Sequence, residues 1–211
     1  IGKKTFEYYK RANILPVSDL LYTFPKKYNV YELISIKDAK DEEKVTIEGV
    51  ICSNPISLKY KKAVDNLMFT LETENIKIKV FMFGKGYLKY SLRKNMKVTI
   101  YGIYKKNRKE IVATEAFVEN FKERIEPVYG LKNINDSQIT KLISNLDINS
   151  IEITDELPEH LVEKYRLLTK KDFIAESHFP ICKESIRQIV RRKKYEEYFN
   201  YLNNFINKQS Y

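Results

Sequence analysis

One predicted strand ends in a run of aromatic and basic residues that suits contact with a polyanion. Over residues 76–83, side chains alternate between two faces of the strand. One face is apolar and carries Ile76, Ile78, Val80 and Met82. The other face carries cations followed by rings, namely Lys77, Lys79, Phe81 and Phe83. Glycines at both ends of 84–86 then allow a close turn, and Tyr87 follows four residues after Phe83.

Two interpretations of this run are open. Exposed rings among cations are what single-stranded nucleic acid requires, because bases stack on rings and phosphates pair with charge. Alternatively, Phe83 and Tyr87 cover a second apolar core, which is where large aromatic side chains are commonly found.

The charge of the chain favours the first interpretation. The net charge is +10, and residues 59–109 hold 14 basic residues against three acidic ones. A basic excess confined to one region is typical of a polyanion site. The alternative is a lysine-rich surface that keeps the protein soluble.

Composition restricts the class of protein. A chain of 211 residues can form one or two domains with a sound core. Its apolar runs are too short for a membrane span, and no secretory leader pattern opens it, so we expect a soluble cytoplasmic protein. Cys52 and Cys182 are far apart in sequence, which fits a reducing compartment.

Period-two alternation predicts an α+β fold built on a small barrel. Five alternating segments are separated by turns, with a short helix over 86–92 between the third and the fourth. The expected strands are 44–52, 67–71, 76–83, 96–104 and 110–118. This order is that of the five-stranded oligonucleotide/oligosaccharide-binding (OB) fold.

Helical patterns flank the expected barrel. Short helices are predicted over 3–14 and 19–24, followed by irregular chain over 26–43. Later helices begin at Asp136 or Ser137 and at Pro158, and a last one covers about 184–208. We therefore expect three parts: an N-terminal helical segment, an OB domain and a helical linker, over 1–43, 44–120 and 121–211.

Two loops flank the ligand face of an OB fold, and here both are basic. They correspond to residues 58–62 and 105–109. The predicted phosphate-binding residues are Lys59, Lys61, Lys62, Lys77, Lys79, Lys85, Lys105, Lys106, Arg108 and Lys109. Tyr60 and Tyr101 are secondary stacking candidates, and the basic run 191–194 is expected to be a solvated helix face.

Catalytic and metal-binding patterns are absent from the sequence. No phosphate-binding loop of the G-x-x-x-x-G-K-[ST] type occurs. The stretch 155–158 begins like a helicase metal-binding box but lacks its fourth residue and a preceding apolar strand. His178 and Cys182 are four residues apart, but two ligands do not make a zinc site. The sequence therefore predicts a binding module without catalytic residues, metal or cofactor.

Several motifs, in order, resemble the N-terminal wedge region of RecG, the bacterial ATP-dependent branch-migration helicase. Residues 1–4 resemble the V-G-P-K opening of that family, with Lys3 in place of proline, and 19–28 resemble D-L-L-x-x-F-P-R-R-Y. Residues 83–88 resemble F-N-x-x-Y-L. Further matches occur at 127–129, 157–158, 167–168, 178–180 and around 192–199.

The resemblance implies a function and partners. It implies that the OB domain splits strands at a DNA branch point, with Phe83 and Tyr87 stacked on bases. The implied partners are branched DNA, such as forks and Holliday junctions, and helicase domains downstream in the same chain. ATP and Mg would serve those missing motor domains, in recombination, repair and stalled-fork processing. The implied protein is a monomer of the bacterial cytoplasm, associated with the nucleoid. Residues 84–86 depart from the family pattern, and we expect a more flexible turn there.

Two other functions remain open at this point. One is a stand-alone OB module that binds single-stranded DNA or RNA. The other is a protein-interaction OB domain whose basic loops meet an acidic partner.

Overall fold

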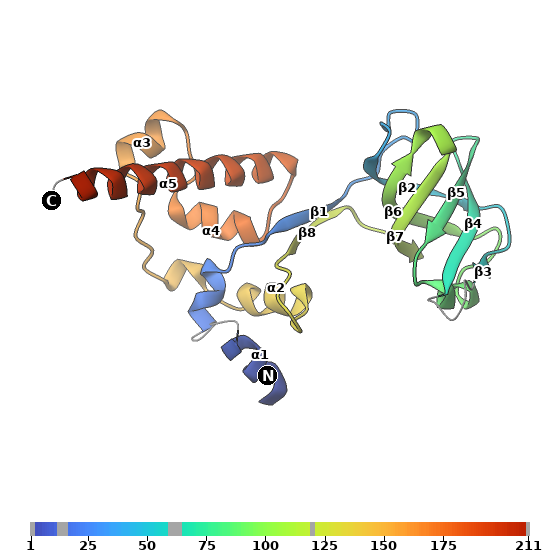
Figure 1. The fold of residues 1–211 in the computed structure, drawn as a ribbon, viewed down its shortest axis with the longest axis horizontal. Coiled ribbons are helices and arrows are strands. Elements are labelled where there is room, and N and C mark those ends of the chain that lie inside the picture. Colours follow the sequence, from blue (N-terminus) through green and yellow to red (C-terminus); the bar gives the residue numbers. More distant parts are fainter. Residues whose placement is uncertain (1–2, 12–16, 59–64, 119–120, 210–211) are drawn as a thin grey trace. The chain divides into compact units, whose positions relative to one another are not determined.

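The computed structural model describes residues 3–11, 17–58, 65–118 and 121–209. Two compact units make up the chain (Figure 1). The barrel unit is residues 31–124, and the helical unit combines residues 1–30 with 125–211. Contacts thus group the N-terminal segment with the C-terminal helices, and the three-part division by role stays a prediction.

The barrel unit is an α+β OB fold, as the sequence predicts. Its strands are β2 (Glu43–Ile51), β4 (Asn66–Thr73), β5 (Ile76–Met82), β6 (Lys97–Lys105) and β7 (Glu110–Val118). They pair in the order β2-β6-β7-β5-β4. The barrel closes where Val50 and Ile51 pair with Glu72 and Leu71. Only β5 and β7 run parallel among these pairs.

The observed strands agree with the predicted ones to within two residues at each end. The predicted helix over 86–92 is a shorter 3₁₀ helix, η2 (Gly86–Tyr90). Two short elements were not predicted: β3 (Ile56–Leu58), which pairs with β4, and the 3₁₀ turn η3 (Lys106–Arg108).

The inner face of the barrel is a single apolar core. On β5, the predicted inner row is confirmed, because Ile78, Val80 and Met82 are fully buried while Lys77 and Lys79 are exposed. The other strands contribute alternate residues to the same core, including Ile47, Phe69, Ile100 and Ile111. Burial of each such side chain stabilises the barrel by about 1.5–3 kcal/mol before the loss of chain entropy.

The helical unit contains a two-stranded ribbon that the sequence did not predict. It pairs β1 (Lys27–Tyr31) with β8 (Arg124–Val128). Region 26–43 was expected to be irregular, and this prediction is wrong for β1. Its partner lies almost a hundred residues away, so no local turn signal marks the pairing.

Helices make up most of the helical unit, and all but α3 of those described contribute to the second apolar core. They are α1 (Lys3–Arg11), η1 (Val17–Tyr22), α2 (Asp136–Ser144), η4 (Ile148–Ser150), α3 (Glu159–Lys164), α4 (Lys170–His178) and α5 (Lys183–Gln209). Leu21, Ile139, Phe173 and Ile189 lie in this core. Helix α4 was not predicted from the sequence, although the Thr169 hydroxyl caps it by accepting from the Asp172 amide.

The basic run 191–194 is not uniformly solvated. Lys193 and Lys194 are exposed, but Arg192 is fully buried, so the expected solvated face is wrong for Arg192. Its Nη2 lies 2.5 Å from Asp155 Oδ1 and 3.3 Å from Glu196 Oε2. Paired in this way, a guanidinium can lie inside a core that would exclude it alone.

Asp155 begins the stretch that resembles a metal-binding box, and its carboxylate has a structural role. It accepts from the backbone amides of Leu157 at 2.9 Å and Lys170 at 2.8 Å, in addition to Arg192. These bonds connect the segment before α3 to the start of α4 and to the middle of α5.

His178 is a buried, uncharged histidine of the helical unit. Its Nε2 lies 3.0 Å from the Leu21 carbonyl oxygen, which can only accept, so Nε2 carries the proton. Nδ1 then accepts from the Tyr129 hydroxyl at 2.8 Å. Burial lowers the pKa of His178, and the bond to Leu21 opposes that shift only partly.

Acid should therefore destabilise the helical unit. Unfolded histidine takes up a proton near pH 6.5, whereas the folded pKa is lower, so stability present above about pH 6.5 is lost as pH falls. The slope should reach at most about 1.4 kcal/mol per pH unit. Thermal unfolding followed by far-ultraviolet circular dichroism between about pH 7.5 and 5.5 measures it.

The two histidines of the chain provide a matched control. His178→Gln should remove the slope, whereas His160→Gln, at an exposed position, should keep it. A slope that persists in His178→Gln would contradict this assignment.

Candidate nucleic-acid interface

The two rings singled out in the sequence are both exposed. Phe83 follows β5 directly and is 66% exposed, while Tyr87 lies on η2 and is 61% exposed. This exposure contradicts the alternative that they cover a second core. Both rings are instead available at the barrel surface.

A neighbouring ring orients Phe83. Phe81, on the outer face of β5, packs edge-to-face against it, with centroids 4.6 Å apart and planes at 79°. Such pairs are worth about 0.5–1.5 kcal/mol beyond their area. Phe81 itself is only half-buried, so the outer face of β5 ends in two adjoining rings.

The turn between the rings is held by its hydrogen bonds and by close packing. Gly84, at φ 69°, donates from its amide to Asn66 Oδ1 at 3.2 Å. The Gly86 amide donates to the Asp65 carbonyl at 2.9 Å. A Cβ at Gly86 would lie only 2.4 Å from that of Asp65, so a residue without a side chain is required there. Gly86, one of the two glycines expected to make this turn flexible, is thus needed for its close contact.

A third exposed ring lies beside Tyr87 and was missed in the sequence. Tyr90 is 75% exposed, with Lys89 Nζ 4.8 Å from the ring centre. Residues three apart eclipse one another on a 3₁₀ helix, so Tyr87 and Tyr90 share a side. Leu88 packs on the core and Leu92 is buried, so η2 is anchored from beneath.

Two of the predicted basic residues lie on the outer face of β5, and the backbone of a third is bonded to that strand. Lys77 and Lys79 are exposed on the outer face of β5, in the same row as Phe81. The Lys79 amide donates to the Lys109 carbonyl at 2.9 Å, which ties the turn between β6 and β7 to this strand. From Lys79 to Phe83 the strand advances about 13 Å.

The predicted basic side chains differ in how free they are to contact a phosphate. Lys106 Nζ donates to the Ala39 carbonyl at 3.1 Å, and Lys85 Nζ lies 3.8 Å from Glu115. Lys105 is half-buried, whereas Arg108 and Lys109 are exposed. Within the described part of the chain, no ion pair involves Lys79, Arg108 or Lys109.

Two groups of predicted site residues have other outcomes. Lys59, Tyr60, Lys61 and Lys62 lie outside the described residues. Tyr101 is only 6% exposed, so its role as a stacking residue is wrong. Its ring packs against Tyr31 at 4.6 Å between centroids, and burial raises the pKa of its hydroxyl. Tyr31 comes from a strand that the sequence did not predict, which is why this cover was missed.

Among the described residues, no three His, Cys, Asp or Glu side chains gather as a metal site. None of the helices described is long and apolar enough to cross a membrane.

Adding a methyl group at Gly86 should loosen the barrel beneath the rings. Gly86→Ala should destabilise it by roughly 1–3 kcal/mol, because the new Cβ meets the Asp65 backbone and side chain. Native-state hydrogen exchange of the β4 and β5 amides measures this change. Gly84→Asn is the control, since asparagine tolerates positive φ and should cost less than about 1 kcal/mol. Equal losses in both variants would contradict the close contact.

The chain is similar to known proteins over most of its length. A family model described as the RecG wedge domain matches residues 1–152. The ATP-dependent DNA helicase RecG of Bacillus subtilis is 32% identical over 202 residues, covering 94% of this chain and 30% of the relative. That of Staphylococcus aureus strain MRSA252 is 30% identical over 208 residues, with the same coverage.

A solved structure of RecG bound to a three-way DNA junction is also similar. It has a TM-score of 0.63 and 26% identity, covering 93% of this chain and 28% of that one. The chain thus spans about a third of the length of these relatives. Because the family model matches well over half of the residues, the chain belongs to the RecG wedge domain family.

Proposed function

We propose that this chain is the wedge module of an ATP-dependent DNA helicase, and that it binds branched DNA and splits strands at the branch point. The observation that carries the proposal is the exposure of Phe83 and Tyr87 on a pinned turn, at the end of a basic strand. Membership of the RecG wedge domain family supports it.

Each part of this surface would make a different contact with DNA. Phe83 and Tyr87 would stack on the last bases of the separated arms, at about 1–3 kcal/mol per base. Tyr90 would extend the aromatic surface along η2. Lys79, Arg108 and Lys109 would neutralise phosphates along the outer side of β5.

The predicted recognition is of DNA structure and not of sequence. Stacking accepts any base, because every base has a π-face, and phosphate contacts carry no sequence information. In the described part of the barrel unit, the helices are short 3₁₀ helices. None of them is an α-helix that could enter a groove and read base edges. A branch point is then the feature that offers unstacked bases and two phosphate backbones together.

Strand separation requires a firm obstacle. The edge-to-face contact on Phe83, the two amide bonds of the turn and the buried anchor of η2 would hold the rings when DNA is pulled past them. The pulling would come from ATP- and Mg-dependent motor domains in a longer chain. The relatives, ATP-dependent DNA helicases of which the match covers 30%, support this arrangement. The same parent would act in recombination, repair and processing of stalled forks, as a monomer near the nucleoid.

Removal of the rings should weaken fork binding selectively. Phe83→Ala/Tyr87→Ala should lower affinity for a model fork at least about tenfold, with a much smaller loss on plain duplex. Fluorescence anisotropy with labelled fork and duplex measures both affinities. Tyr22→Ala, an exposed tyrosine of the helical unit, should change neither. Equal losses on fork and duplex would refute the stacking role.

The same assay separates the alternatives. Equal affinity of the unaltered chain for a fork and for a plain single strand would favour a stand-alone single-strand-binding module. No binding to any nucleic acid near physiological salt would favour a protein-interaction domain with an acidic partner.

Phosphate contacts should make binding dependent on salt. Each phosphate neutralised on duplex arms adds about 0.9 to the slope of log affinity against log salt. Lys79→Gln/Arg108→Gln should therefore lower the slope for fork binding by roughly 1.8. Lys141→Gln, an exposed charge on α2, should leave it unchanged. A flat salt response in the unaltered chain would overturn the proposed function.

A further inference from the structure

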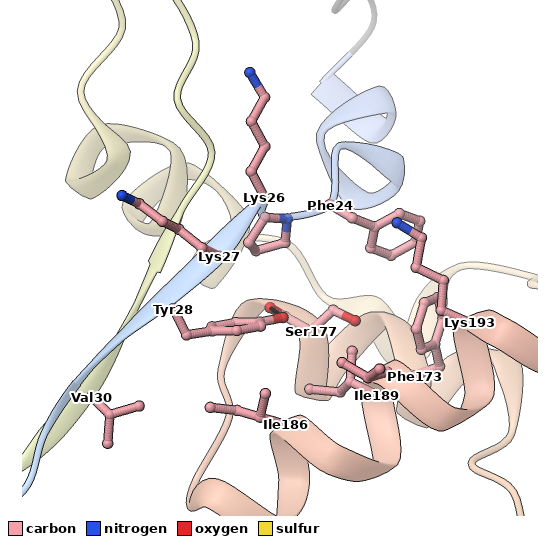
Figure 2. A pocket seen from close by; sticks show the side chains of 12 residues that line it. Phe24, Lys26, Lys27, Tyr28, Val30, Phe173, Ser177, Ile186, Ile189 and Lys193 are labelled. Carbon is pink, nitrogen blue, oxygen red and sulfur yellow. Dashed lines mark hydrogen bonds between the residues drawn. The ribbon is translucent and has the colours of Figure 1, made fainter. Parts of the chain in front are cut away.

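We propose that the helical unit contains a small-molecule site, which takes an amphipathic anion whose apolar body carries one hydroxyl or carbonyl group. This site, the Ser177 pocket, lies between α4, the first half of α5 and the start of β1 (Figure 2). All the described residues that line it belong to the helical unit, so the site does not depend on the proposed function of the barrel.

The walls of the pocket are apolar and come from three parts of the chain. The cavity measures about 450 Å³, within the range of roughly 300–1,000 Å³ that is usual for small-molecule sites. Phe24 and Tyr28 line it from β1 and the residues just before it, and Phe173 lines it from α4. Ile186 and Ile189 line it from α5, where residues 186, 189, 190 and 193 recur at helical spacing and so share one face. Walls of this kind suit a ligand with an apolar body.

Ser177 adds a polar atom without a partner to this apolar wall. The residue is 1% exposed, and within the described part of the chain its Oγ has no hydrogen-bond partner. It does not even bond back to the carbonyl one turn earlier, as helical serines can. Buried polar atoms are nearly always paired, so an orphaned hydroxyl in a cavity wall points to a partner on a ligand. Because a hydroxyl both donates and accepts, that partner can be a hydroxyl or a carbonyl group.

The other hydroxyl of the pocket is already used. Tyr28 donates from its hydroxyl to the Ser177 carbonyl at 2.9 Å. Burial raises the pKa of Tyr28 to about 12, and this hydrogen bond opposes the shift only partly. The phenol is therefore uncharged near neutral pH, and it adds no negative charge to the wall.

The charge of the pocket is positive. Three lysines line it, and none of the described lining residues is Asp or Glu. Lys26 Nζ donates to the Gly130 carbonyl at 3.2 Å, whereas Lys27 and Lys193 are exposed. Lys193 Nζ lies 3.8 Å from Glu197 Oε1, but both side chains are more than half exposed, and such surface pairs are weak. Two ammonium groups are thus available to the anionic head of a ligand.

A nucleotide fits this pocket less well than a simple amphipathic anion. The edge of a base carries several donors and acceptors. Apolar walls with a single free hydroxyl would leave most of them unpaired, which is costly in a buried site. An apolar body with one polar atom matches the pocket instead.

Matched ligands test the role of Ser177. Dodecanoate and 12-hydroxydodecanoate differ by one hydroxyl, and isothermal titration calorimetry below their micelle-forming concentrations measures their affinities for the 211-residue chain. Both should bind at one site with dissociation constants below about 1 mM, the hydroxylated one about two- to tenfold more tightly. Ser177→Ala should abolish this preference without lowering the melting temperature of the free chain, because the hydroxyl has no internal bond to lose.

Adjacent lysines test the charge at the mouth of the pocket. Lys193→Glu should weaken dodecanoate binding at least about tenfold. Lys194→Glu, at an exposed position outside the lining, makes the same change in net charge and should alter affinity less than about twofold. Dodecyl phosphate identifies the head group: tighter binding than dodecanoate indicates a phosphate ester, and weaker binding indicates a carboxylate.

Three results would overturn the proposal. The first is the absence of saturable binding, as would occur if a second copy of the chain filled the pocket. The second is equal weakening by Lys193→Glu and Lys194→Glu. The third is a preference for the hydroxylated ligand that persists in Ser177→Ala.

Discussion

The alternation of β5 is the constraint on which the binding surface depends. Successive side chains of a strand point to opposite faces, so burial of Ile78, Val80 and Met82 forces Lys77, Lys79 and Phe81 outward. A shift of one residue in register would bury the lysines and expose the core row. The pairing with β4 on one side and β7 on the other prevents this shift. The surface is thus determined by the same contacts that stabilise the barrel.

The turn after β5 adds exposed tyrosine rings next to the end of this strand. Gly86 allows η2 to approach the start of β4 closely. Leu92, buried in the barrel core, fixes the chain after η2. Because η2 winds with three residues per turn, its tyrosines face the same way. Close packing, and not the length of the turn, therefore decides where the rings point.

The sequence predicts what is local and misses what is distant. The five barrel strands and the place of Phe83 on the outer face follow from alternation, a signal contained in a few neighbouring residues. Burial of Tyr101 does not, because its cover, Tyr31, comes from a strand that only distant pairing creates. Arg192 was expected in solvent, since its partner Asp155 lies 37 residues away and composition cannot reveal such a pair.

The division of the helical unit between two separate stretches of chain has a consequence for biosynthesis. Residues 31–124 are contiguous, so the barrel can fold as soon as they leave the ribosome. The helical unit must wait, because residues 1–30 find their partners only after residues 125–211 have been made. Leu20 and Leu21 are apolar side chains that stay without their core during this interval. The barrel lies between β1 and β8 in the sequence. Pairing of these two strands therefore brings the two ends of the barrel segment together and closes a loop that contains it.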